Sequence, residues 1–383
     1  MKNQILLITA ECRRRKALGE RVIDLSLGEP DFETPARITA AATRALEQGQ
    51  TRYTPTAGLS PLRVALRKTL SREGLDYSPR EVMVTCGATG ALWCAFRAQL
   101  RPGDEVLLPA PFFPPYAAQI GLAGGVPVLL KTRQADGFKL TAAGLRAAVT
   151  DRSRLLVLNT PANPSGAVYT RDELEALAAV VVETGLLVIS DEVYSTLVYA
   201  AARHTSLAAL GETVRKQVLL VRSFSKSHAM TGWRVGFAAG PEALIREMTS
   251  VQELGMVCLS SASQWAALEA TREVPGEGSD RLFSLEARRD YLHQRLERMD
   301  GVRLVRAEGA LFVFPDLSER VSDVTGFCRS LLERESVALV PGAEFGVPEC
   351  VRISFAASMP ELVEGMDRLA QGLIAYAASR YEA

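Results

Sequence analysis

The sequence has few of the residues that build metal sites and disulfide frameworks. Its 383 residues include three histidines and six cysteines, and no two cysteines are spaced as a CxxC pair. Structural zinc sites and small disulfide-rich domains depend on closely spaced cysteines and histidines, so we expect neither a metal nor a disulfide framework. Scattered cysteines in a chain of this length are typical of a reducing compartment.

The chain also lacks a net charge and a long apolar run. Lys plus Arg number 44 and Asp plus Glu number 44, which argues against nucleic-acid binding through a strong positive field. The apolar run at residues 5–10 is too short for the core of a secretory signal, and no segment approaches the roughly 18 apolar residues that cross a bilayer. We therefore expect a cytoplasmic protein with no nucleic-acid and no membrane partner.

The order of apolar patterns predicts an α/β fold with a mostly parallel sheet. Short runs rich in Val, Leu and Ile lack polar alternation, as in strands that are buried on both faces. Helical patterns separate several of these runs. Thr170 to Glu173 forms a capping box at one helix start, and Thr34-Pro35 and Ser60-Pro61 indicate two more. The predicted strands cover residues 81–85, 105–108, 126–130, 155–158, 186–190 and 218–223.

The C-terminal part follows a different pattern, which predicts a smaller α+β domain that starts near residue 285. Its longest helix is charged and precedes a mixture of short strands and helices. The expected helices cover about 280–299, 322–335 and the residues from 359, and the expected strands cover 303–305, 311–314, 337–340 and 351–355.

Polar or small residues follow four of the predicted strands. Ligands of open α/β sheets bind at the carboxyl ends of the strands, so these residues are candidates for one site. Taken singly, each has an ordinary explanation as a helix cap, a turn or a surface residue. The set comprises Gly87, Ala88 and Thr89 at a helix start, Asn159 and Asn163, Asp191, and Ser223, Ser225 and Lys226.

One ligand would use all of these groups. A helix start with small residues binds phosphate, and Ser223, Ser225 and Arg234 would add hydroxyls and a guanidinium. The carboxylate of Asp191 would keep a pyridine nitrogen protonated, and Lys226 would form a Schiff base with an aldehyde. Phosphate, pyridine and aldehyde together describe pyridoxal 5′-phosphate (PLP).

Eight segments extend this likeness over essentially the whole chain. In their order and spacing the sequence resembles the fold-type I PLP-dependent enzymes, specifically the class I/II aminotransferases and their bacterial aspartate/aromatic branch. The segments are LSLGEPDFETP (25–35), TRYTPTAGLSPLR (51–63), VTCGATGAL (84–92), PGDEVLLPAPFFPPY (102–116), NTPANPSGAVY (159–169), ISDEVYSTLVY (189–199), SFSKSHAMTGWRVGF (223–237) and VRISFA (351–356).

The resemblance implies a fold and a set of roles around the cofactor ring. It implies a large PLP-binding domain with a mostly parallel seven-stranded sheet (46–284) and a small α+β domain made of the N-terminal segment (1–45) and the C-terminal part (285–383). Lys226 would be the Schiff-base lysine and then the base that moves a proton. Asp191 would pair with the ring nitrogen, Tyr194 and Asn163 would bond the ring 3-oxygen, and Phe113 would stack on the ring.

The resemblance also implies the phosphate and substrate contacts. Tyr53 of a neighbouring subunit would reach the phosphate, which requires a homodimer. Arg352 would clamp the substrate α-carboxylate, and Gly28 would leave room beside the substrate and donate its backbone N–H. The chain's own phosphate ligands would be Ala88, Thr89, Ser223, Ser225 and Arg234.

Three positions depart from the family pattern. Phe113 stands where Trp is common, Ser165 replaces a common Thr, and His228 replaces a common aromatic residue. His228 would either pack within the Lys226 loop or contact the substrate in the pocket. Residues 87–90 contain no cation that could bind a carboxylate on the substrate side chain, so strict aspartate specificity is not expected. Arg13 and Arg222 are the other candidates for such a cation. An aromatic or medium-sized side chain would suit the expected lining of Leu7, Ile8, Phe112, Phe113, Tyr116 and His228.

The resemblance predicts an aminotransferase that exchanges an amino group between an L-amino acid and a 2-oxo acid, such as 2-oxoglutarate, by a ping-pong mechanism. A β-lyase, a cyclase or elimination enzyme, or a PLP-dependent oxidase would use the same anchoring residues, so these reactions stay open. A non-catalytic ligand-sensing domain of a transcription regulator is the third possibility. It would need an appended DNA-binding segment, whereas the LSLGEPDF motif already starts at residue 25.

Overall fold

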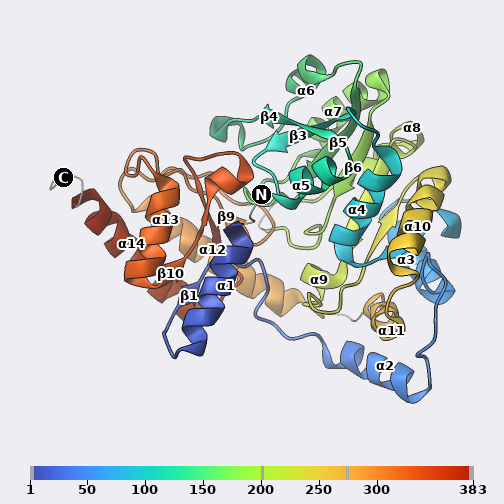
Figure 1. The fold of residues 1–383 in the computed structure, drawn as a ribbon, viewed down its shortest axis with the longest axis horizontal. Coiled ribbons are helices and arrows are strands. Elements are labelled where there is room, and N and C mark those ends of the chain that lie inside the picture. Colours follow the sequence, from blue (N-terminus) through green and yellow to red (C-terminus); the bar gives the residue numbers. More distant parts are fainter. Residues whose placement is uncertain (1–3, 200–201, 273, 275, 379–383) are drawn as a thin grey trace.

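The chain forms two units that lie side by side (Figure 1). The computed structural model describes residues 4–199, 202–272, 274 and 276–378. One unit is built on a seven-stranded sheet, and the other on a two-stranded and a three-stranded sheet. Helix α1 (Gln4–Ala17) lies with the C-terminal elements, so the two ends of the described chain belong to the same unit.

The large sheet has the strand order β2-β8-β7-β6-β5-β3-β4. All neighbours pair in parallel except β8, which is antiparallel to both β2 and β7. This confirms the mostly parallel seven-stranded sheet, although β8 was absent from the predicted runs. Its strands are β2 (Val82–Thr85), β3 (Glu105–Ala110), β4 (Val126–Lys131), β5 (Ser153–Asn159), β6 (Leu187–Asp191), β7 (Val218–Ser223) and β8 (Gly236–Ala239).

Both faces of this sheet are buried except along the edge strand β4, because successive side chains of a strand enter two different cores. In β5, Leu155 and Val157 face one core and Leu156 and Leu158 face the other. The first face is covered by α4 (Gly87–Gln99), α5 (Pro115–Leu122) and α10 (Glu242–Met256). The second is covered by α2 (Ala36–Glu47), α3 (Ser60–Arg72), α6 (Ala142–Ala148), α7 (Arg171–Thr184), α8 (Glu212–Arg215), α9 (Phe224–Ser227) and α11 (Ser261–Ala270).

The helix starts follow the predicted positions, with one capping role confirmed and two not. At α7 the Glu173 N–H donates to Thr170 Oγ1 at 3.3 Å, and the Thr170 N–H donates to Glu173 Oε2 at 2.7 Å, which is the predicted capping box. Helices α2 and α3 begin without a side-chain cap among the described residues. Thr34 instead donates to the Ala229 carbonyl at 2.7 Å, since this threonine lies against the loop that follows Lys226.

The smaller unit contains the predicted α+β pattern with two differences. The predicted strand at 303–305 is only an isolated bridge from Arg303 to Asp316, and the predicted strand at 337–340 is divided between two sheets. Strand β1 (Ile23–Asp24) pairs in parallel with β10 (Val337–Ala338). The other elements are β9 (Phe312–Val313), β11 (Val340–Pro341), β12 (Val351–Ser354), α12 (Ser279–Glu297), α13 (Val324–Glu335) and α14 (Met359–Ala378).

The position of α2 bears on where the predicted domains begin and end. Ile38 and Ala42 of α2 belong to the core of the large sheet, and α2 packs against α11. This packing favours a first limit before residue 36 rather than at residue 45, and the second limit near residue 285 stays a prediction. Within the described ranges, no helix is long and apolar enough to cross a membrane.

Candidate active site

A cavity of about 310 Å³ lies at the carboxyl ends of β5, β6 and β7, between the two units. The large unit supplies most of its wall, and the N-terminal segment, β9 and β12 supply the rest. The residues that were given a cofactor or substrate role all line this cavity except Tyr53: Gly28, Ala88, Thr89, Phe113, Asn163, Asp191, Tyr194, Ser223, Ser225, Lys226, Arg234 and Arg352.

Asp191 is a buried carboxylate at the end of β6. Its Oδ2 accepts a hydrogen bond from the Tyr116 hydroxyl at 2.6 Å, and its Oδ1 accepts one from the Val193 N–H at 3.2 Å. Burial raises the pKa of Asp191 to about 6, although these two hydrogen bonds act in the opposite direction. A buried carboxylate of this kind is suited to pair with a protonated ring nitrogen, which would restore its ionised form.

Tyr116 is the polar partner that the sequence prediction did not assign. It was expected only as part of the substrate wall, but its hydroxyl is fixed on Asp191. Its ring meets Phe113 edge to face, with centroids 5.5 Å apart. Burial and the Asp191 charge raise the pKa of Tyr116, so the phenol stays a hydrogen-bond donor. The segment PFFPPY places this tyrosine at the start of α5, but no local sequence signal pairs it with a strand 75 residues away.

A chain of hydrogen bonds runs from the end of β6 to Arg352. Asn159, the register partner of Asp191, donates to the Asp191 carbonyl at 2.9 Å and accepts from the Asn163 N–H at 2.7 Å. The Asn163 side-chain oxygen then accepts from Arg352 Nη1 at 3.0 Å. Asn163 is therefore in contact with the residue predicted to bind substrate.

Arg352 is a buried guanidinium, 3% exposed, that keeps a donor free. Its Nη2 donates to the Ser26 carbonyl at 2.5 Å, and Nε has no partner among the described residues. The guanidinium lies over the rings of Phe312 and Phe345, 4.3 and 4.9 Å from their centroids. Burial lowers the pKa of Arg352 to about 10, which still leaves it cationic near neutral pH. A planar cation with spare donors fits a carboxylate.

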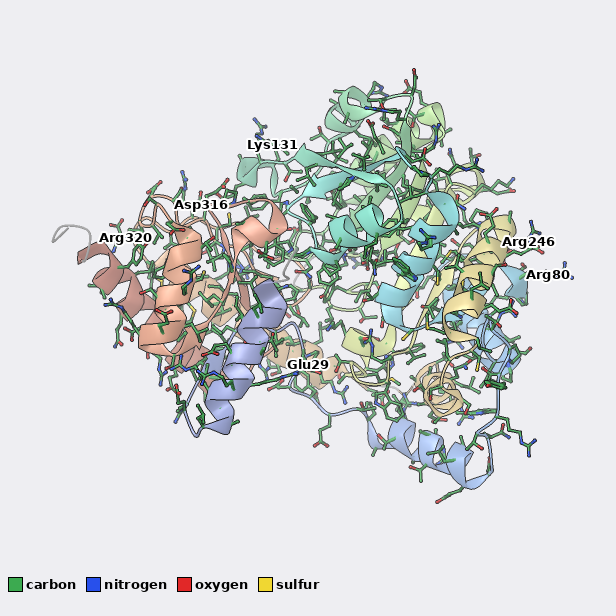
Figure 2. The ribbon with its side chains drawn as sticks, viewed as in Figure 1. Glu29, Arg80, Lys131, Arg246, Asp316 and Arg320 are labelled. Atoms are coloured by element: carbon green, nitrogen blue, oxygen red, sulfur yellow. The ribbon has the colours of Figure 1, made fainter. Side chains whose placement is uncertain are left out.

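Lys226 reaches the cavity from α9, directly after β7. Its Nζ donates to the Gly28 carbonyl at 2.6 Å. Burial lowers the pKa of Lys226 to about 8; Glu29 raises it in part, whereas Arg352 and Arg234 lower it further. Glu29 itself accepts a short hydrogen bond from Thr231 and lies between the two units (Figure 2). A lysine whose pKa is lowered in this way is more readily deprotonated and therefore a better nucleophile.

Gly28 is required by the packing of the cavity wall. A Cβ at this position would lie 2.4 Å from Cζ of Phe312, far inside van der Waals contact. The absence of a side chain at residue 28 thus lets the ring of Phe312 approach the cavity and cover the Arg352 guanidinium.

The groups predicted to hold phosphate converge at the start of α4. This helix begins at Gly87 without a side-chain cap among the described residues, so its first N–H groups are available to an anion. Ser223 and Ser225 lie next to it with their hydroxyl oxygens 2.9 Å apart. A Cβ at Gly236 would lie 3.0 Å from the Ala88 nitrogen, which shows how closely β8 approaches the helix start. With Arg234 beside it, this donor set fits a phosphate.

Several residues considered from the sequence lie elsewhere. Tyr53 is 86% exposed and borders a separate surface hollow. Leu7 and Ile8 line another cavity between α1 and α13, and Phe112 is buried outside the cavity lining. The expected substrate lining is therefore wrong for these three, and only Phe113 and Tyr116 of that set face the cavity.

The remaining candidates also lie outside the cavity lining. His228 borders a second cavity on the other side of the Lys226 loop, where its Nδ1 is 2.7 Å from the Ser227 hydroxyl and burial lowers its pKa to about 4. Arg13 is exposed on α1, and Arg222 is engaged with Glu73 and Glu192. None of these three side chains is placed to contact a substrate in the cavity.

The amino-acid sequence matches known proteins over nearly the whole chain. Residues 20–373 match the family model for aminotransferase class I and II. An aspartate aminotransferase from Bacillus sp. (strain YM-2) is 39% identical over 95% of this chain and 94% of that protein. A probable aspartate/prephenate aminotransferase from Aquifex aeolicus is 39% identical over 96% of this chain and 95% of that protein.

The fold comparison gives the same family. The crystal structure of an aspartate aminotransferase from Rhizobium meliloti superposes with a TM-score of 0.93 at 37% identity, over 97% of this chain and 96% of that one. The donor set around Lys226, Asp191 and the start of α4 fits the aldehyde, ring nitrogen and phosphate of PLP. The chain therefore belongs to the class I and II aminotransferases, and it is a PLP-dependent transferase.

Proposed function

We propose that this enzyme transfers the amino group of an L-amino acid with an uncharged, aromatic or medium-sized side chain to a 2-oxo acid. PLP, when bound, supplies an electrophilic carbon and an electron-withdrawing ring. Lys226 Nζ takes the proton from the substrate Cα and delivers it to C4′ of the cofactor. Asp191 keeps the ring nitrogen protonated, and Arg352 orients the substrate by its α-carboxylate.

The observation that carries this proposal is the set of cations in the cavity. Among the described lining residues, the lysines and arginines are Lys226, Arg234 and Arg352. The proposed roles assign Lys226 to the cofactor carbon, Arg234 to the phosphate and Arg352 to the α-carboxylate. Among the described residues that line the cavity, no other lysine or arginine is left to bind a carboxylate on the substrate side chain. The rest of the wall includes apolar groups from Leu27, Leu92, Phe113, Val193 and Phe312.

Aspartate is the competing donor, because relatives of this chain carry the name aspartate aminotransferase. Its distal carboxylate would need a cation from outside this wall, such as one from a second subunit. Burying that carboxylate without a partner would cost several kcal/mol, so the two proposals predict clearly different donor preferences.

A panel of amino acids, added to the PLP form without any oxo acid, tests the donor class. We expect phenylalanine and leucine to discharge the visible cofactor band at least about 10-fold faster than aspartate, and 2-oxoglutarate to restore it. Faster discharge by aspartate would overturn the side-chain assignment and leave the family assignment intact. Ammonia release or oxygen uptake without restoration would show another PLP reaction.

We further propose a homodimer in which Tyr53 completes the cofactor site of the partner subunit. Tyr53 lies outside its own chain's cavity and is 86% exposed. Leu46, 53% exposed, borders the same hollow, and Leu254 and Val257 are exposed just before residues 258–262 of its rim. Exposed apolar residues gathered in this way support a protein interface.

Mixed dimers test whether Tyr53 acts across the interface. A Lys226→Ala chain paired with a Tyr53→Ala chain would contain one intact site if Tyr53 acts in trans, and none if it acts in cis. We therefore expect the mixed dimer to recover about half of the parent activity, while each variant alone stays low. Absence of recovery in a verified mixed dimer would contradict the proposal.

A further inference from the structure

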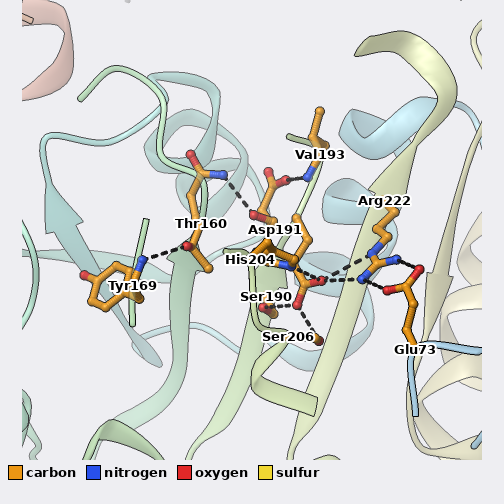
Figure 3. Close-up of polar contacts among 11 residues, drawn as sticks. Glu73, Thr160, Tyr169, Ser190, Asp191, Val193, His204, Ser206 and Arg222 are labelled. Atoms are coloured by element: carbon orange, nitrogen blue, oxygen red, sulfur yellow. Dashed lines mark hydrogen bonds and ion pairs between the residues drawn. The ribbon is translucent and has the colours of Figure 1, made fainter. Parts of the chain in front are cut away.

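A buried charged cluster lies directly behind Asp191, on the side away from the cavity. Its centre is the carboxylate of Glu192, which is fully buried. Glu192 Oε1 accepts hydrogen bonds from the hydroxyls of Ser190 at 3.0 Å and Ser206 at 2.6 Å (Figure 3). Glu192 Oε2 lies 3.0 Å from His204 Nε2 and 2.9 Å from Arg222 Nη2. No cofactor role assigned above uses this cluster.

Arg222 connects the cluster to β7 and then to the protein surface. It is 8% exposed and directly precedes Ser223. Its Nη1 donates to Glu73 Oε1 at 2.9 Å, and the Glu73 side chain is 43% exposed. Two charged partners therefore hold one guanidinium: the fully buried Glu192 and the partly exposed Glu73. Figure 3 shows the contact between Arg222 and Glu73.

The cluster and the cavity are built from the same two strand ends. At β6, Asp191 lines the cavity and the next residue, Glu192, enters the cluster. At β7, Ser223 lines the cavity and the preceding residue, Arg222, enters the cluster. Successive residues of an extended chain point to opposite sides. The Glu192–Arg222 pair therefore links the ends of β6 and β7 on the side away from the cavity, next to Asp191 and Ser223, which face the cavity.

Both members of the pair are ionised near neutral pH. Burial alone would raise the pKa of Glu192, but the electrostatic interactions with His204 and Arg222 and the hydrogen bonds outweigh it and lower the pKa to about 2. Burial would lower the pKa of Arg222, but Glu192 and Glu73 outweigh it and raise that pKa. Removing the charge of Glu192 leaves Arg222 with the partly exposed Glu73 as its remaining acidic partner. The buried side of the guanidinium then lacks a compensating charge, so the strand ends are expected to move apart.

We propose that Glu192 and Arg222 are positioning residues that fix the ends of β6 and β7, and so set the separation between Asp191 and the phosphate-binding residues Ser223 and Ser225. The proposal rests on the cofactor roles proposed above for these three residues. It predicts that loss of the pair weakens PLP binding and changes the protonation of the bound ring together, because both ends of the cofactor site move.

The experiment compares Glu192→Gln with Glu73→Gln. Glu192→Gln keeps the shape of the side chain and removes the charge, whereas the control removes the exposed partner of the same Arg222. The readouts are the dissociation constant of PLP for the apoenzyme and the pH profile of the bound cofactor's visible band. We expect Glu192→Gln to weaken PLP binding about 10-fold or more, as for outer partners of metal ligands, and to shift the profile. The control is expected to change binding by no more than about 2-fold, because exposed pairs contribute little.

Asp191→Asn serves as the reference for the site itself. If it alters the band profile while Glu192→Gln leaves both readouts at the parent values, the positioning role is overturned. If Asp191→Asn leaves the profile unchanged, the assignment of Asp191 fails rather than the cluster. A fall in melting temperature alone, with binding and profile unchanged, would assign the pair a purely structural role and would also overturn the proposal.

Milder variants answer the question if Glu192→Gln does not fold. Ser206→Ala removes one of the four partners of the carboxylate, and His204→Gln changes another. Each is expected to weaken PLP binding by a few fold and to move the band profile in the same direction. PLP binding and a profile equal to the parent in both folded variants would overturn the proposal. The other titratable groups near the carboxylate are Tyr77, through its charge interaction, and Asp191.

Discussion

Replacing Tyr116 by phenylalanine isolates the hydrogen bond that holds Asp191 in its ionised form. The hydroxyl lies 2.6 Å from Oδ2, and this bond lowers the pKa of Asp191 against the effect of burial, which leaves it at about 6. PLP binding through a protonated ring nitrogen needs ionised Asp191. The affinity of the parent apoenzyme for PLP should therefore weaken as the pH falls through about 6.

The size of the change follows from the strength of one bond. A hydrogen bond to an ionised group contributes about 1.5–3 kcal/mol, and about 1.4 kcal/mol corresponds to one pH unit. Tyr116→Phe should thus move the midpoint of the pH dependence upward by about one to two pH units, from about 6 to about 7 or above. PLP binding at pH 6.5 should be weaker in the variant, and the difference should become small by about pH 9, where Asp191 is ionised in both proteins.

The assay is a titration of apoenzyme with PLP between about pH 5 and pH 9, followed by the bound cofactor's absorbance. Tyr169→Phe is the matched control, because that tyrosine is also buried and its hydroxyl accepts a hydrogen bond from the Leu140 N–H at 2.7 Å, outside the cavity lining. A midpoint in Tyr116→Phe equal to that of the parent and the control would refute the reasoning about Asp191.

Other residues of the site give further predictions. Arg352→Lys loses the two-pronged geometry, so KM for amino acid and oxo acid should rise about 10- to 100-fold while PLP affinity is unchanged; an unchanged KM in steady-state kinetics would contradict the clamp. The pKa of Lys226 in the folded apoenzyme, about 8, lies below the usual 10.5, so the unfolded chain binds more protons between these values and stability rises with pH there. Lys226→Met should therefore stabilise the apoenzyme at pH 7, by at most about 3 kcal/mol, with a gain that shrinks towards pH 10.5; thermal unfolding across pH measures this, and a constant difference would contradict it. Gly236→Ala should displace the start of α4 and weaken PLP binding, since overpacking costs about 1–3 kcal/mol, whereas Gly255→Ala, which meets no heavy atom within 4 Å, should not; equal PLP titrations for the two would refute the cradle argument.

The parts of the fold that follow from local pattern were predictable from the sequence. All of the apolar runs became strands of the large sheet, because burial on both faces leaves a clear compositional trace in most of them. The edge strand β4 is apolar as well, although Val126 and Leu129 are exposed. Strand β8 was not found, since GFAA is short and consists mainly of small residues. The capping role of Thr34 failed because its hydroxyl bonds the Ala229 carbonyl instead, and that of Ser60 failed because this residue is already the first residue of α3.

Site residues that stand in a sequence motif were predictable, whereas contacts that depend on tertiary packing were not. Asp191, Lys226 and Arg352 stood in recognisable segments, and the cavity gathers them. The bond from Tyr116 to Asp191 depends on how α5 lies against the sheet, which no local pattern encodes. Leu7 and Ile8 were expected in the substrate lining, but α1 packs them against α13 instead.

The contact between Gly28 and Phe312 restricts how sequences of this kind can diverge. A side chain at residue 28 would collide with the ring, so it requires a smaller residue at 312. Phe312 also covers the guanidinium of Arg352, so shrinking it would expose that cation to water. Substitutions at these positions are therefore coupled, and single-site libraries would discard most useful combinations. A library that varies residues 28 and 312 together is the shorter route to a cavity with a new substrate wall.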